Sequence, residues 1–270
     1  SWRQMFVMFG LVGFAWVAAW RIWYHDNPEE HPTFSAAERD RILAERPKDV
    51  PHTEGASYFL RLLRDRNVIA LCVMYMSNSM MFYFCITWLP EYLRQRHGFD
   101  ATALGFLSGL PLLVSVPSDL FGGIVTDRLS ARFGLKVGRC VLGAIAYSIS
   151  AVALWVAAAS AAPLPAAILI AVATGVCMFT LGAAWGVCSE IGRNHIAVVG
   201  AIMNTAGQIA SMACPVIVAY SVSWFKNWDF PLYLLSVLFA IGAVCWLVID
   251  PNRPVFDDGV AAEAREQKVA

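Results

Sequence analysis

Seven apolar stretches, each about long enough to cross a lipid bilayer as a helix, take up most of this 270-residue chain. A hydrocarbon core about 30 Å thick requires about 20 mostly apolar residues in helical form. Because the bilayer offers no partners to backbone N–H and C=O groups, continuous stretches of this length are helices rather than strands. The stretches are 3–24, 67–94, 102–127, 138–159, 164–190, 196–220 and 230–249. The sequence therefore predicts an all-α, polytopic membrane protein with seven transmembrane helices.

Composition supports a membrane protein and argues against several other classes. Hydrophobic residues make up 58% of the chain, and charged residues make up 15%, below the roughly 25% of soluble domains. The formal net charge is zero, so nothing indicates nucleic acid. The seven cysteines form no CxxC pair and fall inside the apolar stretches, which favours buried thiols over a metal site. We expect no metal and no cofactor.

The basic residues lie almost entirely on one side of the stretches. When the connections are assigned alternately to two sides, one side holds 16 Lys and Arg residues in 21–66, 128–139, 191–195 and 250–270. The other side holds Arg3, Arg94, Arg96 and Lys226. The positive-inside rule places the first side in the cytoplasm, with the N-terminus outside and the C-terminus inside. We expect location in a bacterial inner (plasma) membrane.

The chain divides into four predicted segments: a transmembrane helix at 1–24, a cytoplasmic linker at 25–66, a six-helix bundle at 67–250 and a cytoplasmic tail at 251–270. Within the linker, Ser35 and Glu38 form a capping-box pattern that opens a short amphipathic helix through Arg46. Basic residues that typically contact anionic lipid precede the bundle; they are Arg61, Arg64 and Arg66. Because the chain begins at Ser1, close to a span, we expect it to be part of a longer protein.

A charged motif follows the third stretch. The residues from Gly123 to Arg132 follow the pattern G-x-x-x-D-R-x-x-x-R, which includes Asp127 and Arg128. Gly123 would allow neighbouring helices to approach closely. A facing helix N-terminus or an arginine would stabilise the Asp127 carboxylate, while the arginines would hold the loop in the cytoplasm. We interpret the motif as a gating loop.

This motif resembles the loop signature of the major facilitator superfamily, which occurs between helices 2 and 3 and again between helices 8 and 9. The string Thr87-Trp88-Leu89-Pro90, followed by Tyr92-Leu93, resembles the end of helix 7 in the anion:cation symporter family. The segments 189–191 and 200–208 are similar to its helix 10–11 region. The resemblance aligns the first stretch with helix 6, the linker with the central linker, and the rest with helices 7–12.

The resemblance implies a secondary active transporter, or a fragment of one, that moves a small organic anion such as a sugar acid or hexuronate. It implies H⁺ symport, or Na⁺ as the coupling ion, and alternating access by rocking of two halves. The expected partners are therefore the anion, the coupling ion, membrane lipid and the missing N-terminal half. In the family, that half carries the cation that meets the anion and the main protonation carboxylates. The sequence contains neither an HExxH nor a GxSxG motif, so no such motif indicates an enzyme.

Two amides stand out among the polar residues at membrane depth, where polar groups usually face the bundle interior or a water-filled cavity. Asn204 and Gln208 lie four residues apart in the stretch 196–220, with Ser211 on the same side. The resemblance implies that these positions contact the hydroxyls of a sugar acid. The alternative is hydrogen bonding between helices, with Gly207 and Ser211 as a packing face.

Further candidates for substrate contact lie in two other stretches. Tyr75, Asn78 and Tyr83 occupy the middle of 67–94. Together with Ser79 they spread over roughly 140° of a helix, so at least one of them packs against a neighbouring helix. Thr180 in 164–190 is the last candidate, with a core position as its alternative.

Asp119 is the one carboxylate well inside a stretch. Burial would raise the pKa of a carboxyl group and suit it to proton coupling. The alternative is a residue near the cytoplasmic edge that serves the gate.

Two other functions stay open at this stage. A seven-helix receptor or sensor fits the number of spans and their orientation, although the longest connection follows the first helix and the last span has no lysine for retinal. A non-functional transporter fragment is the other alternative, because half a bundle would expose its cavity face.

Overall fold

The computed structural model describes residues 2–25, 35–45 and 56–256. The chain forms two compact units, residues 1–52 and 53–270, each considered by itself. The end of the predicted linker helix at Arg46 and the tail residues 257–270 lie outside the described residues.

The first unit contains an apolar helix, α1 (Trp2–Trp23), and a short polar helix, α2 (Ala36–Glu45). The backbone N–H and hydroxyl of Ser35 donate to the Glu38 carboxylate at 3.1 and 2.8 Å, and the Glu38 N–H donates to the Ser35 hydroxyl at 3.3 Å. These are the reciprocal bonds of a capping box, so the predicted start of this helix is confirmed. The hydrogen bonds from Ser35 lower the pKa of the Glu38 carboxyl.

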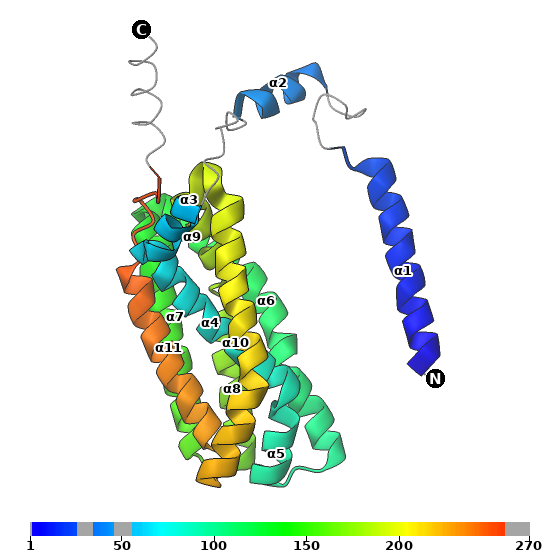
Figure 1. Cartoon of the computed structure of the whole chain (residues 1–270). Coiled ribbons are helices and arrows are strands. Elements are labelled where there is room, and N and C mark those ends of the chain that lie inside the picture. The colour runs from blue at the N-terminus through cyan, green and yellow to red at the C-terminus, as the bar shows by residue number, and fades with distance from the viewer. Residues whose placement is uncertain (1, 26–34, 46–55, 257–270) are drawn as a thin grey trace. The chain divides into compact units, whose positions relative to one another are not determined.

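The second unit is a bundle of long helices that lie side by side, with α3 at one end and α5 at the other (Figure 1). The elements are α3 (Ala56–Arg64), α4 (Arg66–Thr87), α5 (Leu89–His97), α6 (Ala101–Phe133), a π-helical turn (Lys136–Val141), α7 (Leu142–Ala159), α8 (Pro163–Met178), α9 (Leu181–Gly192), a 3-10 turn (Arg193–His195), α10 (Ile196–Phe225) and α11 (Phe230–Val248). The described residues include no strand.

Six stretches of the described helices are long and apolar enough to cross a membrane. One of them, Pro163–Phe225, is 63 residues long and runs through α8, α9 and α10. It covers both of the predicted spans 164–190 and 196–220. The all-α, polytopic membrane fold is confirmed.

Two of the predicted spans are broken helices. The span 67–94 contains a break at Trp88, where α4 ends and α5 begins with Pro90 in its first turn. Proline has no N–H and its ring clashes with the preceding turn, so it starts a helix more easily than it continues one. The span 164–190 breaks at Phe179–Thr180, between α8 and α9.

Serine hydroxyls join helices through hydrogen bonds to backbone carbonyls in the bundle core. Ser77 of α4 donates to Leu238 of α11 at 3.0 Å, and Ser236 of α11 donates to Ala151 of α7 at 2.7 Å. Ser150 of α7 donates to Ala173 of α8 at 2.9 Å. Small polar residues of this kind join helices in lipid, where unpaired hydroxyls are unfavourable. The three hydrogen bonds link α4 to α11, α11 to α7, and α7 to α8.

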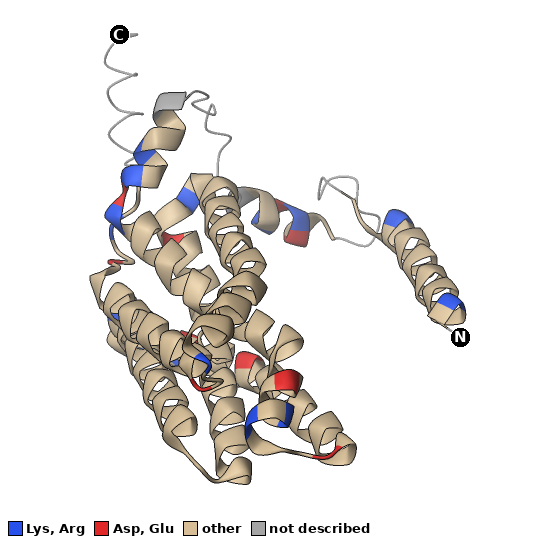
Figure 2. Cartoon of the chain, turned by 60° about the horizontal axis from the view of Figure 1, so that its bottom comes forward, with Lys and Arg blue, Asp and Glu red and all other residues tan. Residues whose placement is uncertain are grey.

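Most of the described basic residues gather at the end of the bundle where α4 begins, which we call the basic end; charges concentrate near the helix ends (Figure 2). There the Asn67 amide donates to the carbonyls of Asp250 and Arg253, each at 3.0 Å, and accepts from the Asp250 N–H at 3.0 Å. The Lys136 ammonium donates to the carbonyls of Leu247 and Ile249. These bonds satisfy a carbonyl in the last turn of α11 and carbonyls of the residues that follow it, which have no partner within the helix.

The opposite end is held by an ion pair between α5 and the residue before α11. The Arg96 guanidinium donates to both carboxylate oxygens of Asp229, at 2.8 and 2.9 Å. This hydrogen bonding raises the pKa of Arg96. Tyr92 donates to the same carboxylate at 3.5 Å. The short helix α5 is therefore tied to the start of α11.

Two glycines of α6 cross the break between α8 and α9. A Cβ atom on Gly122 would overlap the carbonyl oxygen of Phe179, and a Cβ atom on Gly182 would lie 3.2 Å from the Cα of Gly123. The helices therefore approach here as closely as their backbones allow.

We expect Gly122→Ala to lower the free energy of unfolding by about 1–3 kcal/mol, because the added methyl group meets backbone that has no room to move. Gly109→Ala is the matched control on the same helix, since a Cβ atom there has no neighbour within 4 Å. Thermal or denaturant unfolding in detergent, followed by helical circular dichroism, measures both variants. Equal stability of the two variants would contradict the packing described here.

Candidate functional site

The loop motif ends α6 at the basic end, where a network of three charged residues forms. The nearest nitrogens of the Arg139 guanidinium lie 3.9 Å from a carboxylate oxygen of Asp127 and 3.4 Å from one of Glu190. Arg139 is mostly buried, with 13% of its side chain exposed, because the guanidinium lies against Gly186 of α9. A Cβ atom on Gly186 would overlap the Arg139 side chain. The network connects α6, the π-helical turn and α9.

The other cations of the motif take no part in this network. Arg128 and Arg132 are exposed, and the Arg132 guanidinium lies 5.2 Å from the ring centre of Phe133. An arginine or a helix N-terminus was expected beside Asp127, but the pairing of Glu190 with Arg139 was not predicted. The sequence did hold a signal for this pair. Arg139 lies near the start of the otherwise apolar stretch 138–159, where an arginine without a carboxylate partner is unfavourable.

The two amides of α10 are exposed in the bundle. Asn204 and Gln208 make no hydrogen bond within the part of the chain that the structure describes. Between them, Gly207 packs against the side chains of Tyr75 and Ser79 from α4. At about 100° per residue, Asn204 and Gln208 lie about 60° and 100° around the helix from Gly207. The amides therefore flank the contact between α10 and α4 on one side.

Leaving these amides in contact with lipid would be unfavourable. An amide moved from water into an apolar environment without a hydrogen-bond partner costs roughly 2–7 kcal/mol, depending on the reference state. Ser211, which the sequence places on the same side, is buried with 2% exposed. The exposed polar face of α10 is thus formed by Asn204 and Gln208 and requires water, a ligand or another polar surface.

The candidates on α4 lie in different surroundings. Tyr75 is half-buried beside Gly207, and its ring meets that of Trp185 from α9 edge-on, with centroids 6.3 Å apart. Tyr83 is partly exposed, and its carbonyl accepts from the Thr87 hydroxyl at 2.6 Å. Tyr75 is therefore the α4 candidate that lies next to the amide-bearing helix.

Asn78 and Thr180 have partners within the bundle. Asn78 is 6% exposed and its amide donates to the carbonyl of Cys177 at 3.4 Å, while the Thr180 hydroxyl donates to the same carbonyl at 2.8 Å. Cys177 lies in the last turn of α8, where carbonyls lose their helical partners. Both side chains therefore support the break between α8 and α9.

Asp119 lies partly exposed on α6, two turns before Asp127. Its carboxylate has neither an ion pair nor a hydrogen bond within the described ranges. It is thus a carboxylate in an apolar helix that has no partner among the residues that the structure describes.

Comparison with known proteins agrees with this architecture. The family model that describes the Major Facilitator Superfamily matches residues 1–215 of the chain. The protein named "Probable sulfoacetate transporter SauU" of Cupriavidus necator is 28% identical over 269 residues, which are 98% of this chain and 62% of that protein. "Probable galactarate/D-glucarate transporter GudP" of Bacillus subtilis is 29% identical over 295 residues, covering 94% of this chain and 60% of that protein.

A plant relative extends the comparison. "Probable anion transporter 4, chloroplastic" of Oryza sativa subsp. japonica is 27% identical over 95% of this chain and 43% of its own length. The chain thus spans between 43% and 62% of the lengths of these three relatives. The superfamily and these relatives are transporters and not enzymes. By the match over most of its length, the chain belongs to the Major Facilitator Superfamily.

Proposed function

We propose that this chain forms the C-terminal part of a secondary active transporter that carries a small organic anion by alternating access. The observation that carries this proposal is a pair of exposed amides on the largely apolar helix α10, Asn204 and Gln208, which have no hydrogen-bond partner among the described residues. The relatives' names give the anions sulfoacetate, galactarate and glucarate, and these support a sugar acid or a similar carboxylate or sulfonate as the substrate.

The chemistry of the amides suits such a substrate. An amide both donates and accepts hydrogen bonds, as hydroxyl and acid groups require. Four residues along a helix correspond to about 6 Å, so the two amides can contact neighbouring groups of one small molecule. Tyr75, beside Gly207, is the third member of this proposed site. In this proposal, the packing of helices and not contact with the substrate is the role of Asn78, Tyr83 and Thr180.

The charge of the substrate requires a cation that these helices lack. In the described helices of the second unit, Lys and Arg lie near the helix ends. We therefore assign the counter-charge to an N-terminal half, as the resemblance to the anion:cation symporters implies. The same proposal includes H⁺ coupling, with Na⁺ as the alternative, and assigns the proton-linked role within this chain to Asp119. It places the basic end in the cytoplasm of a bacterial cell.

Uptake of labelled glucarate, galactarate and sulfoacetate by cells expressing the full-length transporter tests this function. We expect uptake of at least one of these anions, and we expect a protonophore to abolish its accumulation. Accumulation that follows a Na⁺ gradient instead would change the coupling ion. Absence of uptake for all three anions in a correctly inserted protein would overturn the proposed substrate class.

For the amides, we expect Gln208→Ala and Asn204→Ala each to raise the KM for the transported anion by roughly tenfold, the loss of about one hydrogen bond. Surface expression should be unchanged because neither amide has a partner in the bundle. Met212→Ala is the control, since Met212 lies one turn further along α10 and is 76% exposed. If the amide variants had the same KM as the control, both residues would be removed from the site.

For the gating loop, we expect Arg139→Gln to slow anion exchange more than Asp127→Asn does, with anion affinity little changed in both. Arg139 is mostly buried and serves two carboxylates, whereas Asp127 is 77% exposed. Arg253→Gln is the control, because it removes another ion pair at the basic end, 3.9 Å from Asp65. Exchange rates in proteoliposomes measure the effect. Wild-type exchange by Arg139→Gln would refute a gating role for the network.

A further inference from the structure

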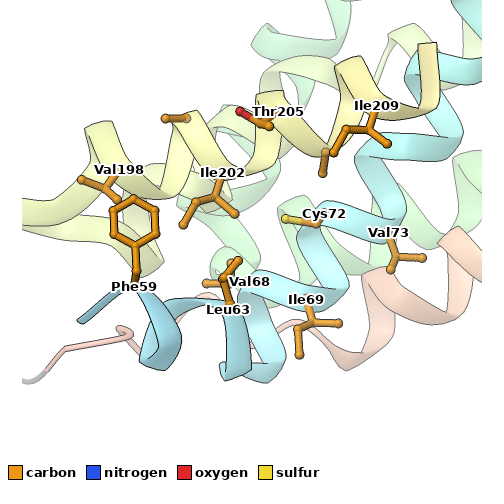
Figure 3. Close-up of a pocket in the computed structure, with 12 residues that line it drawn as sticks. Phe59, Leu63, Val68, Ile69, Cys72, Val73, Val198, Ile202, Thr205 and Ile209 are labelled. Carbon is orange, nitrogen blue, oxygen red and sulfur yellow. The ribbon is translucent and has the colours of Figure 1, made fainter. Parts of the chain in front are cut away.

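An apolar groove of about 480 Å³ runs between α3, α4 and α10 at the basic end (Figure 3). Phe59 and Leu63 of α3 close one end, and α4 and α10 form the two walls. The wall residues that define the groove are Val68, Ile69, Val73, Val198, Ile202 and Ile209. Apart from the Thr205 hydroxyl and the Cys72 thiol, the lining side chains are hydrocarbon. The groove is therefore suited to an apolar ligand and not to a soluble anion.

Neither amide lines the groove. Measured around the helix from Gly207, the lining residues extend from Ala206 at about −100°, through the side of the helix away from Gly207, to Ala201 at about +120°. Asn204 and Gln208 lie at about +60° and +100°. The groove therefore borders the amides along one edge, and its hydrocarbon lining distinguishes it from the proposed substrate surface.

The length of the groove corresponds to one leaflet of a bilayer. From Val198 to Ile209, α10 advances by about 16 Å. This is about half of a hydrocarbon core of roughly 30 Å. Because the groove begins at the basic end, it covers the depth of the acyl chains in the leaflet on that side.

Cations without partners lie beside this groove. Arg64 follows the lining residue Leu63, and Arg66 begins α4 two residues before the lining residue Val68. Both are exposed, and neither has a carboxylate within 4 Å in the described part of the chain. The neighbouring carboxylate of Asp65 is engaged elsewhere.

The Asp65 carboxylate caps α4 by accepting hydrogen bonds from the N–H groups of Asn67 and Val68. One of its oxygens also lies 3.9 Å from a guanidinium nitrogen of Arg253. The arginines therefore keep their charge for an external anion. The helix α3 carries Arg61 and Arg64 together with half-exposed apolar side chains, as do helices that lie in the membrane interface. A hollow of about 470 Å³ lined by Arg61 and Arg64 adjoins the same helix.

We propose that this groove binds an anionic phospholipid from the leaflet at the basic end. One acyl chain lies between α4 and α10, and the headgroup phosphate lies on Arg64 and Arg66. The charge complementarity selects a lipid over a protein helix, since a helix filling an apolar groove would leave both cations unpaired. The two arginines should favour an anionic over a zwitterionic headgroup by roughly tenfold or more.

Native mass spectrometry of the purified chain with added lipid tests the proposal. Phosphatidylglycerol and phosphatidylethanolamine with identical acyl chains are titrated separately. We expect the chain to retain phosphatidylglycerol roughly tenfold more strongly. Arg64→Gln with Arg66→Gln should abolish this preference, while Arg132→Gln, which removes an exposed cation at the end of α6, should keep it. Equal retention of both lipids by the unaltered chain would overturn the proposal, as would an unchanged preference in the double variant.

Two further measurements identify the occupant of the groove. Ala206→Phe places a ring in the groove and should lower retention of both lipids, provided that circular dichroism shows a folded protein; unchanged retention would show that no acyl chain lies there. A photo-crosslinking residue at position 202, activated in cell membranes, should yield a lipid adduct. A peptide adduct would show that a protein helix covers the groove and would overturn the proposal even if Ala206→Phe failed to fold.

Discussion

The absence of hydrogen-bonding partners in a bilayer is the constraint on which this structure depends. It makes the long apolar stretches helical, and it favours hydrogen bonds from polar side chains to backbone carbonyls, several of them on neighbouring helices. Ser77, Ser150 and Ser236 illustrate the result in the core. At the basic end, Asn67 and Lys136 satisfy carbonyls that α11 and the residues after it leave open. Hydrogen bonds from side chains to backbone carbonyls therefore hold helices together both in the middle of the bundle and at its basic end.

The same constraint separates structural from functional polar residues. Asn78 and Thr180 bond to one carbonyl at the break between α8 and α9 and are explained by the fold alone. Asn204 and Gln208 have no such partner, so they are explained only by something outside the described bundle. The charged network at Asp127, by contrast, pairs charges within the chain at 3.9 and 3.4 Å, but the buried Nη1 of Arg139 makes no hydrogen bond among the described residues. Such loose pairing suits a contact that forms and breaks during the proposed transport.

Much of the fold could be predicted from the sequence, because hydrophobic length and basic-residue asymmetry are properties of the chain itself. The loop motif also indicated the superfamily. The breaks at Trp88 and Phe179 were not predicted; Pro90 signalled the first, but a span is defined by hydropathy, which does not register a local break. The partner of Arg139 was not predicted because Glu190 lies about 50 residues away in the sequence and is brought close by packing. The sequence placed Asn78 among the candidates for substrate contact, and it could not show that contacts between helices bury this side chain.

Helix α10 thus has an exposed face that carries two amides along one edge and a hydrocarbon groove beside them. We propose that the edge of α10 that carries the amides faces water during transport. Labelling of single cysteines at positions 204, 208 and 212 by a membrane-impermeant thiol reagent, in a background without the native cysteines, tests this exposure to water. We expect fast labelling at 204 and 208 that the transported anion slows, and slow labelling at 212. Equally slow labelling at all three positions would contradict it.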